Sequence, residues 1–288
     1  MGMDHSLKPE TPSLPPINVS RLLRDYGIRP DKSLGQNFLQ DDAALRKIIS
    51  VSQIAPSDTI LEIGPGLGSL TRYLAITAKD VIAVELDDSL LPILSSVLKE
   101  FKNARVIQGD ILKIPVADLI KSNTYRVVAN IPYYITSAII RHLLESQPKP
   151  KSIVLTVQKE VAQRICAKPG DMSLLALSVQ VFGQPEIVAD ISSEAFFPAP
   201  NVDSSVIRIK IFSEPAIPAP QLDSFFRLAK AGFSQKRKTL RNSLSAGLSI
   251  SVGDAEGLLK KSGIDPKRRA ETLSISEWAY LTSMYKYK

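Results

Sequence analysis

The chain has 288 residues, enough for one large domain or two unequal ones. Hydrophobic residues make up 44% and charged residues 23% of the sequence, close to the averages of globular proteins, which disfavours fibrous folds and disorder throughout. The only cysteine is Cys166 and the only histidines are His5 and His142. A disulfide framework and a zinc site of the usual Cys/His spacing are thereby excluded, and we expect no metal.

The surplus of positive over negative charge lies in the last quarter of the chain. Lys and Arg number 36 and Asp and Glu 29, for a net charge of +7, and residues 221–288 alone hold 13 basic and 6 acidic side chains. The other 220 residues therefore carry 23 charges of each sign and are neutral overall. Clustered Lys and Arg favour a polyanionic partner because they displace counterions from phosphates. A solvated helical surface is the alternative interpretation.

Residues 1–16 contain Pro9, Pro12, Pro15 and Pro16 and are expected to lack a fixed structure. The same residues lack the apolar stretch of a secretory signal. No apolar run in the chain approaches the roughly 20 residues that span a bilayer. We therefore expect a cytoplasmic protein without a membrane partner.

The first periodic element is a short helix from Ser20 to Tyr26, capped by Ser20 and ended by Gly27 in a left-handed conformation. Short apolar runs then alternate with helix-length segments. The predicted strands are 59–63, 80–85, 105–108, 125–129 and 151–157. The predicted helices include 69–78, 89–101, 136–145 and 159–167.

This alternation predicts an α/β fold with a parallel sheet covered on both faces. Two further strands, 186–191 and 204–211, follow without a convincing helix between them. Because a connection without a helix does not easily return a strand parallel to its predecessor, these two are predicted to form an antiparallel edge. The expected sheet is mostly parallel and has seven strands.

The proline-rich stretch 213–220 indicates a linker, and helical periodicity without strands follows it at 222–232, 237–244, 252–261 and 276–285. We therefore predict three parts. They are an unstructured start at 1–16, an α/β domain at 17–217 and a small all-α domain at 218–288. The basic surplus belongs to this all-α domain.

The sequence Glu62-Ile-Gly64-Pro-Gly66-Leu-Gly68 lies where the first strand of the sheet should turn into a helix. Glycines at this point let the backbone pass close to a ligand. The dinucleotide-binding pattern has two residues between its second and third glycines, whereas here each gap is one residue. The loop resembles the S-adenosylmethionine loop of Rossmann-like methyltransferases, and a tight strand-to-helix turn is the alternative.

Two acidic residues at later strand ends strengthen the cofactor hypothesis. Glu85 ends the second strand of the sheet, where a carboxylate can accept hydrogen bonds from both ribose hydroxyls. Asp110 follows the third strand and could accept from an adenine amino group, with Leu86 and Ile111 on either side of the ring. Either acid alone is more often a solvated strand-end residue, but in this order they predict a cofactor crevice.

The sequence Asn130-Ile-Pro-Tyr133-Tyr134 follows the fourth strand of the sheet. The exocyclic amine of adenine is a poor nucleophile because its lone pair is delocalised into the ring. The Asn130 side-chain oxygen and a neighbouring carbonyl can accept both N–H bonds, and Tyr133 can stack on a flipped base. Positioning of the amine against the methyl donor could then supply most of the rate enhancement. A proline-terminated strand with two boundary tyrosines is the alternative.

Together these motifs resemble the KsgA-type ribosomal RNA adenine dimethyltransferases over about residues 27–285. The family methylates two adjacent adenosines near the 3′ end of small-subunit ribosomal RNA. The similar motifs are Leu34-Gly-Gln36-Asn37-Phe38-Leu39, the glycine loop, Glu85, Gly109-Asp110, Asn130-Ile-Pro-Tyr133, 158–164, 196–204, 233–241 and 269–273. The last two distinguish this family from the related 23S ribosomal RNA methyltransferases.

The resemblance implies S-adenosylmethionine as cofactor and assigns roles to single residues. Asn37 and Leu39 would lie over the cofactor, and Asn130 would touch both the cofactor and the target amine. Phe196 would form the wall of the base pocket opposite Tyr133, although sequence alone favours a core aromatic. The cofactor-binding residues implied are Asn37, Leu39, Gly64, Gly66, Glu85, Leu86, Asp110, Ile111 and Asn130.

The basic run Lys236-Arg237-Lys238 with Arg241 has helical spacing, and it is the expected RNA-binding segment. The resemblance thus implies a monomeric enzyme that dimethylates two neighbouring adenosines of a late small-subunit precursor. A 23S-directed methyltransferase, a non-catalytic ribosome-assembly factor and a DNA methyltransferase remain alternatives.

Overall fold

The computed structural model describes residues 14–122, 124–132 and 135–285. The chain forms two compact units, which we call unit 1 and unit 2. Unit 1 comprises 1–159 with 188–208, and unit 2 comprises 160–187 with 209–288. The predicted domain boundary near residue 218 stays a prediction. Unit 2 also contains residues 160–187 and 209–217, which the prediction places in the α/β domain.

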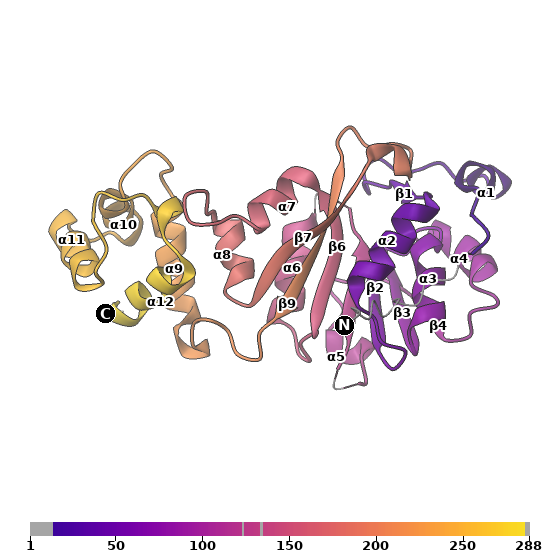
Figure 1. Ribbon diagram of the computed structural model, residues 1–288, viewed down its shortest axis with the longest axis horizontal. Helices are drawn as coiled ribbons and strands as arrows, with labels where there is room; N and C mark the ends of the chain where they lie inside the picture. Colours follow the sequence, from indigo (N-terminus) through magenta and orange to yellow (C-terminus); the bar gives the residue numbers. More distant parts are fainter. Residues whose placement is uncertain (1–13, 123, 133–134, 286–288) are drawn as a thin grey trace, which may run out of the picture. The chain divides into compact units, whose positions relative to one another are not determined.

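A seven-stranded sheet forms the centre of the fold, with the order β4-β3-β2-β5-β6-β9-β7 (Figure 1). Strands β4, β3, β2, β5 and β6 pair in parallel, and the sheet has one antiparallel edge, so the predicted α/β fold class is confirmed. A separate antiparallel pair, β1 with β8, was not predicted. The strands are β1 (Phe38–Leu39), β2 (Thr59–Ile63), β3 (Asp80–Glu85), β4 (Ala104–Gln108), β5 (Arg126–Asn130), β6 (Ser152–Gln158), β7 (Gly183–Ile191), β8 (Phe196–Phe197) and β9 (Ser204–Ile211).

Helices connect these strands and make up most of the chain after β9 (Figure 1). The α-helices are α1 (Val19–Asp25), α2 (Asp42–Ser52), α3 (Ser69–Thr77), α4 (Leu91–Val97), α5 (Val116–Leu119), α6 (Thr136–Glu145), α7 (Lys159–Ile165), α8 (Leu174–Gln180), α9 (Leu222–Phe233), α10 (Leu240–Leu248), α11 (Val252–Lys261) and α12 (Ile275–Met284). Within the described ranges, no helix is both long enough and apolar enough to span a bilayer.

Two details of the predicted helices need correction. The cap of α1 is Asn18, whose side chain accepts the N–H of Arg21, and Ser20 instead lies inside the helix. Gly27 does follow α1 with φ +67°, as predicted. Helix α10 begins at Leu240 rather than at Arg237, so the basic run before it lies in a turn.

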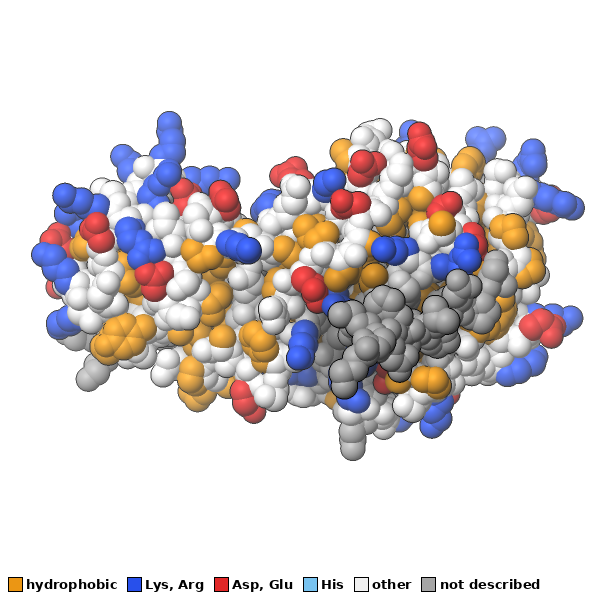
Figure 2. All heavy atoms as spheres, in the orientation of Figure 1, with side chains coloured by type: hydrophobic (Ala, Val, Ile, Leu, Met, Phe, Trp, Pro, Cys, Tyr) orange, Lys and Arg blue, Asp and Glu red, His pale blue; other side chains and the backbone are white. Residues whose placement is uncertain are grey.

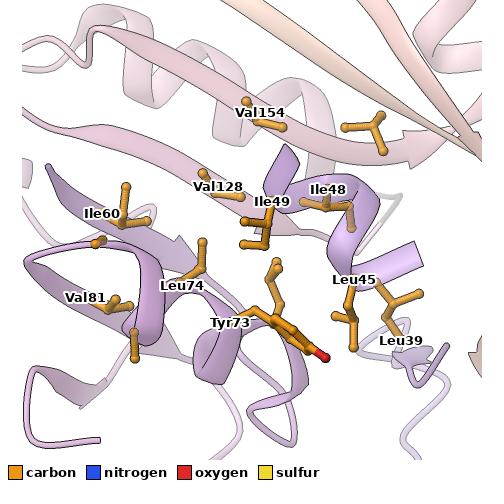
Figure 3. Close-up of a cluster of buried hydrophobic side chains, with 14 of the residues drawn as sticks. Leu39, Leu45, Ile48, Ile49, Ile60, Tyr73, Leu74, Val81, Val128 and Val154 are labelled. Carbon is orange, nitrogen blue, oxygen red and sulfur yellow. The ribbon is translucent and has the colours of Figure 1, made fainter. Parts of the chain in front are cut away.

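The core of unit 1 lies between the sheet and helices α2 and α3. Strand residues Ile60 and Val128 pack with Ile48 of α2 and Leu74 of α3, and all four side chains are buried (Figure 3). The hydroxyl end of Tyr73 in α3 turns away from this cluster and donates a hydrogen bond to Asp42. This packing fixes α3, and with it the end of the glycine loop that precedes α3.

Residues 14–16 differ from the expectation for the proline-rich start. The Leu14 N–H donates to the Tyr73 hydroxyl (3.1 Å), and the Arg72 guanidinium donates to the Pro15 carbonyl (2.8 Å). Both partners lie in α3. The chain just before α1 therefore lies along α3, although proline content alone favours an unstructured segment. Residues 1–13 lie outside the described part of the chain.

In unit 2, Trp278 of α12 is buried and stacks on Phe233 at the end of α9, with ring centroids 6.0 Å apart. Gly232 of α9 permits this packing, because a Cβ there would lie 2.7 Å from the Trp278 ring. Helix α12 starts with a capping box, in which Ser274 and Glu277 each accept a backbone N–H of the other. Close helix contact at glycine and a well-capped last helix stabilise a unit that contains little sheet.

Candidate cofactor site

The candidate site lies at the carboxyl edge of the parallel strands. Strands β4, β3, β2 and β5 are neighbours, so the residues that follow them meet at one edge, where open α/β sheets bind ligands. A cavity at this edge is lined by residues from all four strand ends and by the segment 34–39. It includes all nine residues predicted to bind the cofactor: Asn37, Leu39, Gly64, Gly66, Glu85, Leu86, Asp110, Ile111 and Asn130. Their binding roles remain predictions.

The glycine loop adopts a conformation that other residues rarely take. Gly64, Gly66 and Gly68 have φ of +68°, +58° and +82°, in the left-handed region. A Cβ on Gly66 would lie 3.0 Å from the Phe38 ring. The loop therefore needs glycine both for its backbone angles and for the close approach of the segment above the cavity.

Glu85 is held in place by backbone groups on both sides. Its Oε2 accepts the Gly66 N–H (3.0 Å) and its Oε1 accepts the Asp87 N–H (2.9 Å). Burial raises the pKa of the Glu85 carboxyl, and these N–H groups oppose that rise. The carboxylate is thus fixed at the end of β3, the position expected for a ribose-binding acid.

Asp110 and two apolar side chains form another part of the cavity. The Asp110 carboxylate accepts the Leu112 N–H (3.0 Å) and lies 3.5 Å from the Lys113 ammonium. Ile111 is buried, whereas Leu86 is 46% exposed although it is a large apolar residue. An exposed leucine and a buried isoleucine lining one cavity fit the predicted contact with a flat, apolar ring.

Asn130 joins the end of β5 to the segment above the cavity. Its Nδ2 donates to the Asn37 carbonyl (3.3 Å), and the Asn37 side chain in turn donates to the Gly35 carbonyl (3.2 Å). With Nδ2 engaged in this way, Oδ1 is the acceptor that Asn130 presents. Tyr133, the predicted stacking residue, lies outside the described residues, as does Tyr134.

Phe196 is a buried residue in the structure. It is 2% exposed, pairs with Leu39 across the β1–β8 ladder and belongs to the apolar cluster of unit 1. It is not among the residues that line the cavity. Leu39 itself does line the cavity, so Phe196 supports the cavity wall from behind. Its role as a wall of the base pocket stays a prediction.

The predicted RNA-binding residues fall into two groups. Lys236, Arg237 and Lys238 are exposed in the turn between α9 and α10, where Figure 2 shows blue side chains gathered at the upper left. Arg241 is half-buried in α10, and its guanidinium lies 3.0 Å from the Glu256 carboxylate. The exposed turn is open to a polyanion, whereas Arg241 is held by an acid of α11.

Two residues of the cavity wall were not given roles from sequence. Glu62 is 1% exposed, and burial raises the pKa of its carboxyl to about 8. Gln36 donates from its side chain to Asp87 (2.6 Å). Glu62 lies two residues before Gly64, and this place in the glycine motif was a sequence signal that could have identified it as a cavity residue. Gln36 meets a partner 51 residues away, and no local pattern could reveal that contact.

The charges of the cavity define the kind of ligand it suits. Its described lining contains three carboxyl groups, those of Glu62, Glu85 and Asp110, and neither Lys nor Arg. Such a lining disfavours a pyrophosphate and suits a ligand that combines a ribose and an apolar ring with positive charge. Fold and cavity together define a methyltransferase of the Rossmann-like class.

Comparisons with known proteins narrow this class. The family model for ribosomal RNA adenine dimethylase matches residues 28–286, and the chain belongs to this family. A ribosomal RNA small subunit methyltransferase A of Dehalococcoides mccartyi is 45% identical over 276 residues, which covers 96% of this chain and 94% of that protein. The family resemblance predicted from the motifs is confirmed, and the chain is an enzyme of the rRNA adenine dimethyltransferase class.

Two solved structures share the fold at moderate identity. The 23S rRNA methyltransferase ErmE has a TM-score of 0.70 and 27% identity, covering 86% of this chain and 99% of that one. A dimethyladenosine transferase from Plasmodium falciparum has a TM-score of 0.71 and 27% identity, covering 85% of this chain and 95% of that one. Both similarities extend over most of this chain.

Proposed function

We propose that this enzyme transfers methyl groups from S-adenosylmethionine to the N6 amines of two adjacent adenosines near the 3′ end of small-subunit ribosomal RNA. The observation that carries the proposal is the cavity at the sheet edge, which is lined by three carboxyl groups and by no described Lys or Arg. The small-subunit substrate is supported by the name of the Dehalococcoides mccartyi relative, which is 45% identical to this chain. The solved 23S enzyme is 27% identical.

The cavity residues fit each part of this donor. Glu85 would accept from the ribose hydroxyls, Leu86 and Ile111 would flank the adenine ring, and Asp110 would accept from its amino group. When bound, the donor supplies a methyl group activated by its sulfonium. The Glu62 carboxyl, whose pKa burial raises to about 8, is mostly neutral at pH 7, so the negative charge of the cavity comes from Glu85 and Asp110.

Asn130 would prepare the target amine. Its Nδ2 is engaged with the Asn37 carbonyl, so its Oδ1 faces the reaction as a fixed acceptor. An amine that donates to this oxygen keeps its lone pair out of the ring and directed at the methyl group. Because the donor is already activated, positioning alone is worth up to about 7 to 11 kcal/mol in ideal cases. The protein needs no histidine base for this step.

The exposed basic turn would bind the RNA backbone. Lys236, Arg237 and Lys238 project from the turn before α10 and can each approach a phosphate. Arg241 contributes mainly to the structure of unit 2 through its ion pair with Glu256. The RNA site we propose is therefore the turn itself.

The Asn130→Ala variant tests this function. It removes the acceptor for the target amine, so methyl transfer to small subunits that lack the modification should fall at least about 100-fold, an effect typical of lost transition-state positioning. Cofactor affinity, measured by calorimetry, should change only a few-fold. The Asn130→Asp variant keeps an acceptor oxygen and should retain more activity. Full activity of the alanine variant would overturn the role of Asn130.

A further inference from the structure

The side chain of Gln36 joins two segments that line the cofactor cavity. Gln36 belongs to the segment 34–39, and its Nε2 donates to Oδ2 of Asp87 (2.6 Å), just beyond Glu85 and Leu86. The other end of the same amide, Oε1, accepts the Asp31 N–H (2.7 Å). Both ends of the Gln36 amide are thus engaged, one within its own segment and one across to the chain after β3.

Asp87 is a firm anchor that does not depend on Gln36. Its other carboxylate oxygen, Oδ1, accepts the Ser89 N–H (3.0 Å) and the Ser89 hydroxyl (2.6 Å) at the start of the short helix Asp88–Leu90. The Asp87 N–H donates to Glu85. The hydrogen bond from Gln36 therefore ties the segment above the cavity to the residue that holds the ribose-binding acid.

The chain at 31–37 is bonded mostly to itself. Gln36 N–H donates to the Asp31 carbonyl (3.2 Å), Gly35 N–H donates to the Lys32 carbonyl (3.1 Å), and Ser33 bonds the Asp31 carboxylate. Among the hydrogen bonds described for residues 31–37, two lead to the rest of the protein. One is the 3.3 Å bond that Asn37 accepts from Asn130, and the other is the 2.6 Å bond from Gln36 to Asp87.

The bond to Asp87 is the stronger of these two attachments. It is shorter, and its acceptor is a carboxylate, which makes a hydrogen bond roughly twice as strong as one between neutral groups. The bond to Asn37 lies at the end of 31–37, whereas Gln36 also holds the start of this stretch through Asp31. Loss of the Asp87 bond would therefore leave the Asn130–Asn37 bond as the remaining outward hydrogen bond described for 31–37.

We propose that Gln36 is a clasp that holds residues 31–37 closed over the bound cofactor and sets the rate at which cofactor leaves. This inference rests on the proposed function. Two methyl groups on each of two adenosines require four donors per RNA, and each transfer leaves a spent cofactor that must depart. Gln36 is a positioning residue, because it acts by holding Asn37 over the cavity.

A pair of variants that exchanges donor and acceptor tests the clasp. Gln36→Glu places a carboxylate against Asp87, and Asp87→Asn weakens the acceptor to a neutral amide. The double variant Gln36→Glu/Asp87→Asn restores a donor facing a carboxylate, with side chains of the original shapes. Gln40→Glu is the matched control, because Gln40 is a nearby glutamine that does not line the cavity and the change is chemically identical.

The readout is the dissociation rate of S-adenosylhomocysteine, measured by surface plasmon resonance on full-length protein whose Tm is unchanged. We expect Gln36→Glu to release it about tenfold faster, as for one lost hydrogen bond to a charged group, and Asp87→Asn to release it measurably faster. The double variant should return to within about threefold of the wild type, and Gln40→Glu should match the wild type.

Two results would overturn the clasp. One is unchanged dissociation in both single variants, and the other is no rescue in the double variant. Wild-type protein that binds no S-adenosylhomocysteine would instead overturn the proposed function, and the clasp with it. The failure of the clasp and the failure of the proposed function are therefore distinguishable in the same experiment.

Discussion

At the scale of single residues, the cavity is unusual in holding a buried carboxyl that carries a proton at neutral pH. Burial raises the pKa of Glu62 to about 8, and the neighbouring Glu85 adds to the rise. Its Oε2 is buried without a hydrogen-bond partner in the described structure. A carboxyl in that setting favours its neutral form at neutral pH.

Glu62 should therefore make the folded protein less stable as pH rises. Its pKa is about 8 in the fold against 4.5 for an ordinary glutamate, so its contribution is complete below about pH 4.5 and lost by about pH 8. Between these limits the free energy of unfolding should fall by about 1.4 kcal/mol per pH unit relative to Glu62→Gln. Urea unfolding at pH 5, 6, 7 and 8 measures this. The exposed Glu100→Gln is the control, and parallel curves for wild type and Glu62→Gln would contradict the burial argument.

The residues that sequence could assign are those whose function follows from their place on a strand. Glu85, Asp110 and Asn130 stand at or just after strand ends, and the structure brings all three to one cavity. For the remaining residues of the site, the position depends on tertiary contacts. The Gln36–Asp87 bond joins distant residues, and the burial of Phe196 depends on its pairing with Leu39. Neither contact leaves a periodic signal in the sequence.

At the scale of elements, helices α9 and α10 approach closely enough that their crossing tolerates only small residues. A Cβ on Gly247 of α10 would lie 2.6 Å from both Cα and Cβ of Ala231 in α9. Backbone cannot yield as a side-chain tip can. The crossing point therefore sets the packing of the two helices that flank the basic turn.

Gly247→Ala should destabilise unit 2 by about 1 to 3 kcal/mol, because the methyl group forces the helices apart. Gly257→Ala is the matched control, since a Cβ at this position of α11 would meet no neighbouring atom within 4 Å. That change should be neutral or stabilise by up to about 1 kcal/mol, because alanine favours helix. Thermal unfolding of both variants compares them, and equal Tm values would show that the crossing is not tight.

Most elements with a clear period were predicted, whereas the amphipathic helix α2 and several short or atypical elements were not. Strands β2 to β6 and helix α11 match the alternation of apolar runs closely. Helix α8 was missed because its buried run Leu-Leu-Ala-Leu-Ser-Val is too short and too apolar to distinguish helix from strand. The two-residue strands β1 and β8 exist only through their pairing with each other.

At the scale of the whole molecule, the acidic cavity lining and the basic surplus lie in different parts of the chain. The cavity of unit 1 has an acidic lining, and the surplus of +7 lies within residues 221–288. Counting charges along the sequence was enough to place this surplus. It could not show that the basic run lies in a turn, because the spacing of the run also suits a helix.

Charge reversal at Arg237 and Lys238 should weaken RNA binding and reduce its dependence on salt. Each lost phosphate contact lowers the slope of log K against log salt by about 0.7 to 0.9, so two losses should lower it by about 1.5. Filter binding of small subunits between about 50 and 200 mM salt measures the slope. Reversal of the exposed Lys99 and Lys102 alters net charge equally and serves as control. Equal slopes for the two variants would favour the solvated-surface interpretation.

The most direct test of the account is to identify the product. Small ribosomal subunits that lack the modification would be incubated with the enzyme and labelled S-adenosylmethionine, and the RNA would be digested and analysed by mass spectrometry. We predict N6,N6-dimethyladenosine at two adjacent positions near the 3′ end of the small-subunit RNA. Tight binding of these subunits without methyl transfer, while a known enzyme modifies the same subunits, would contradict it.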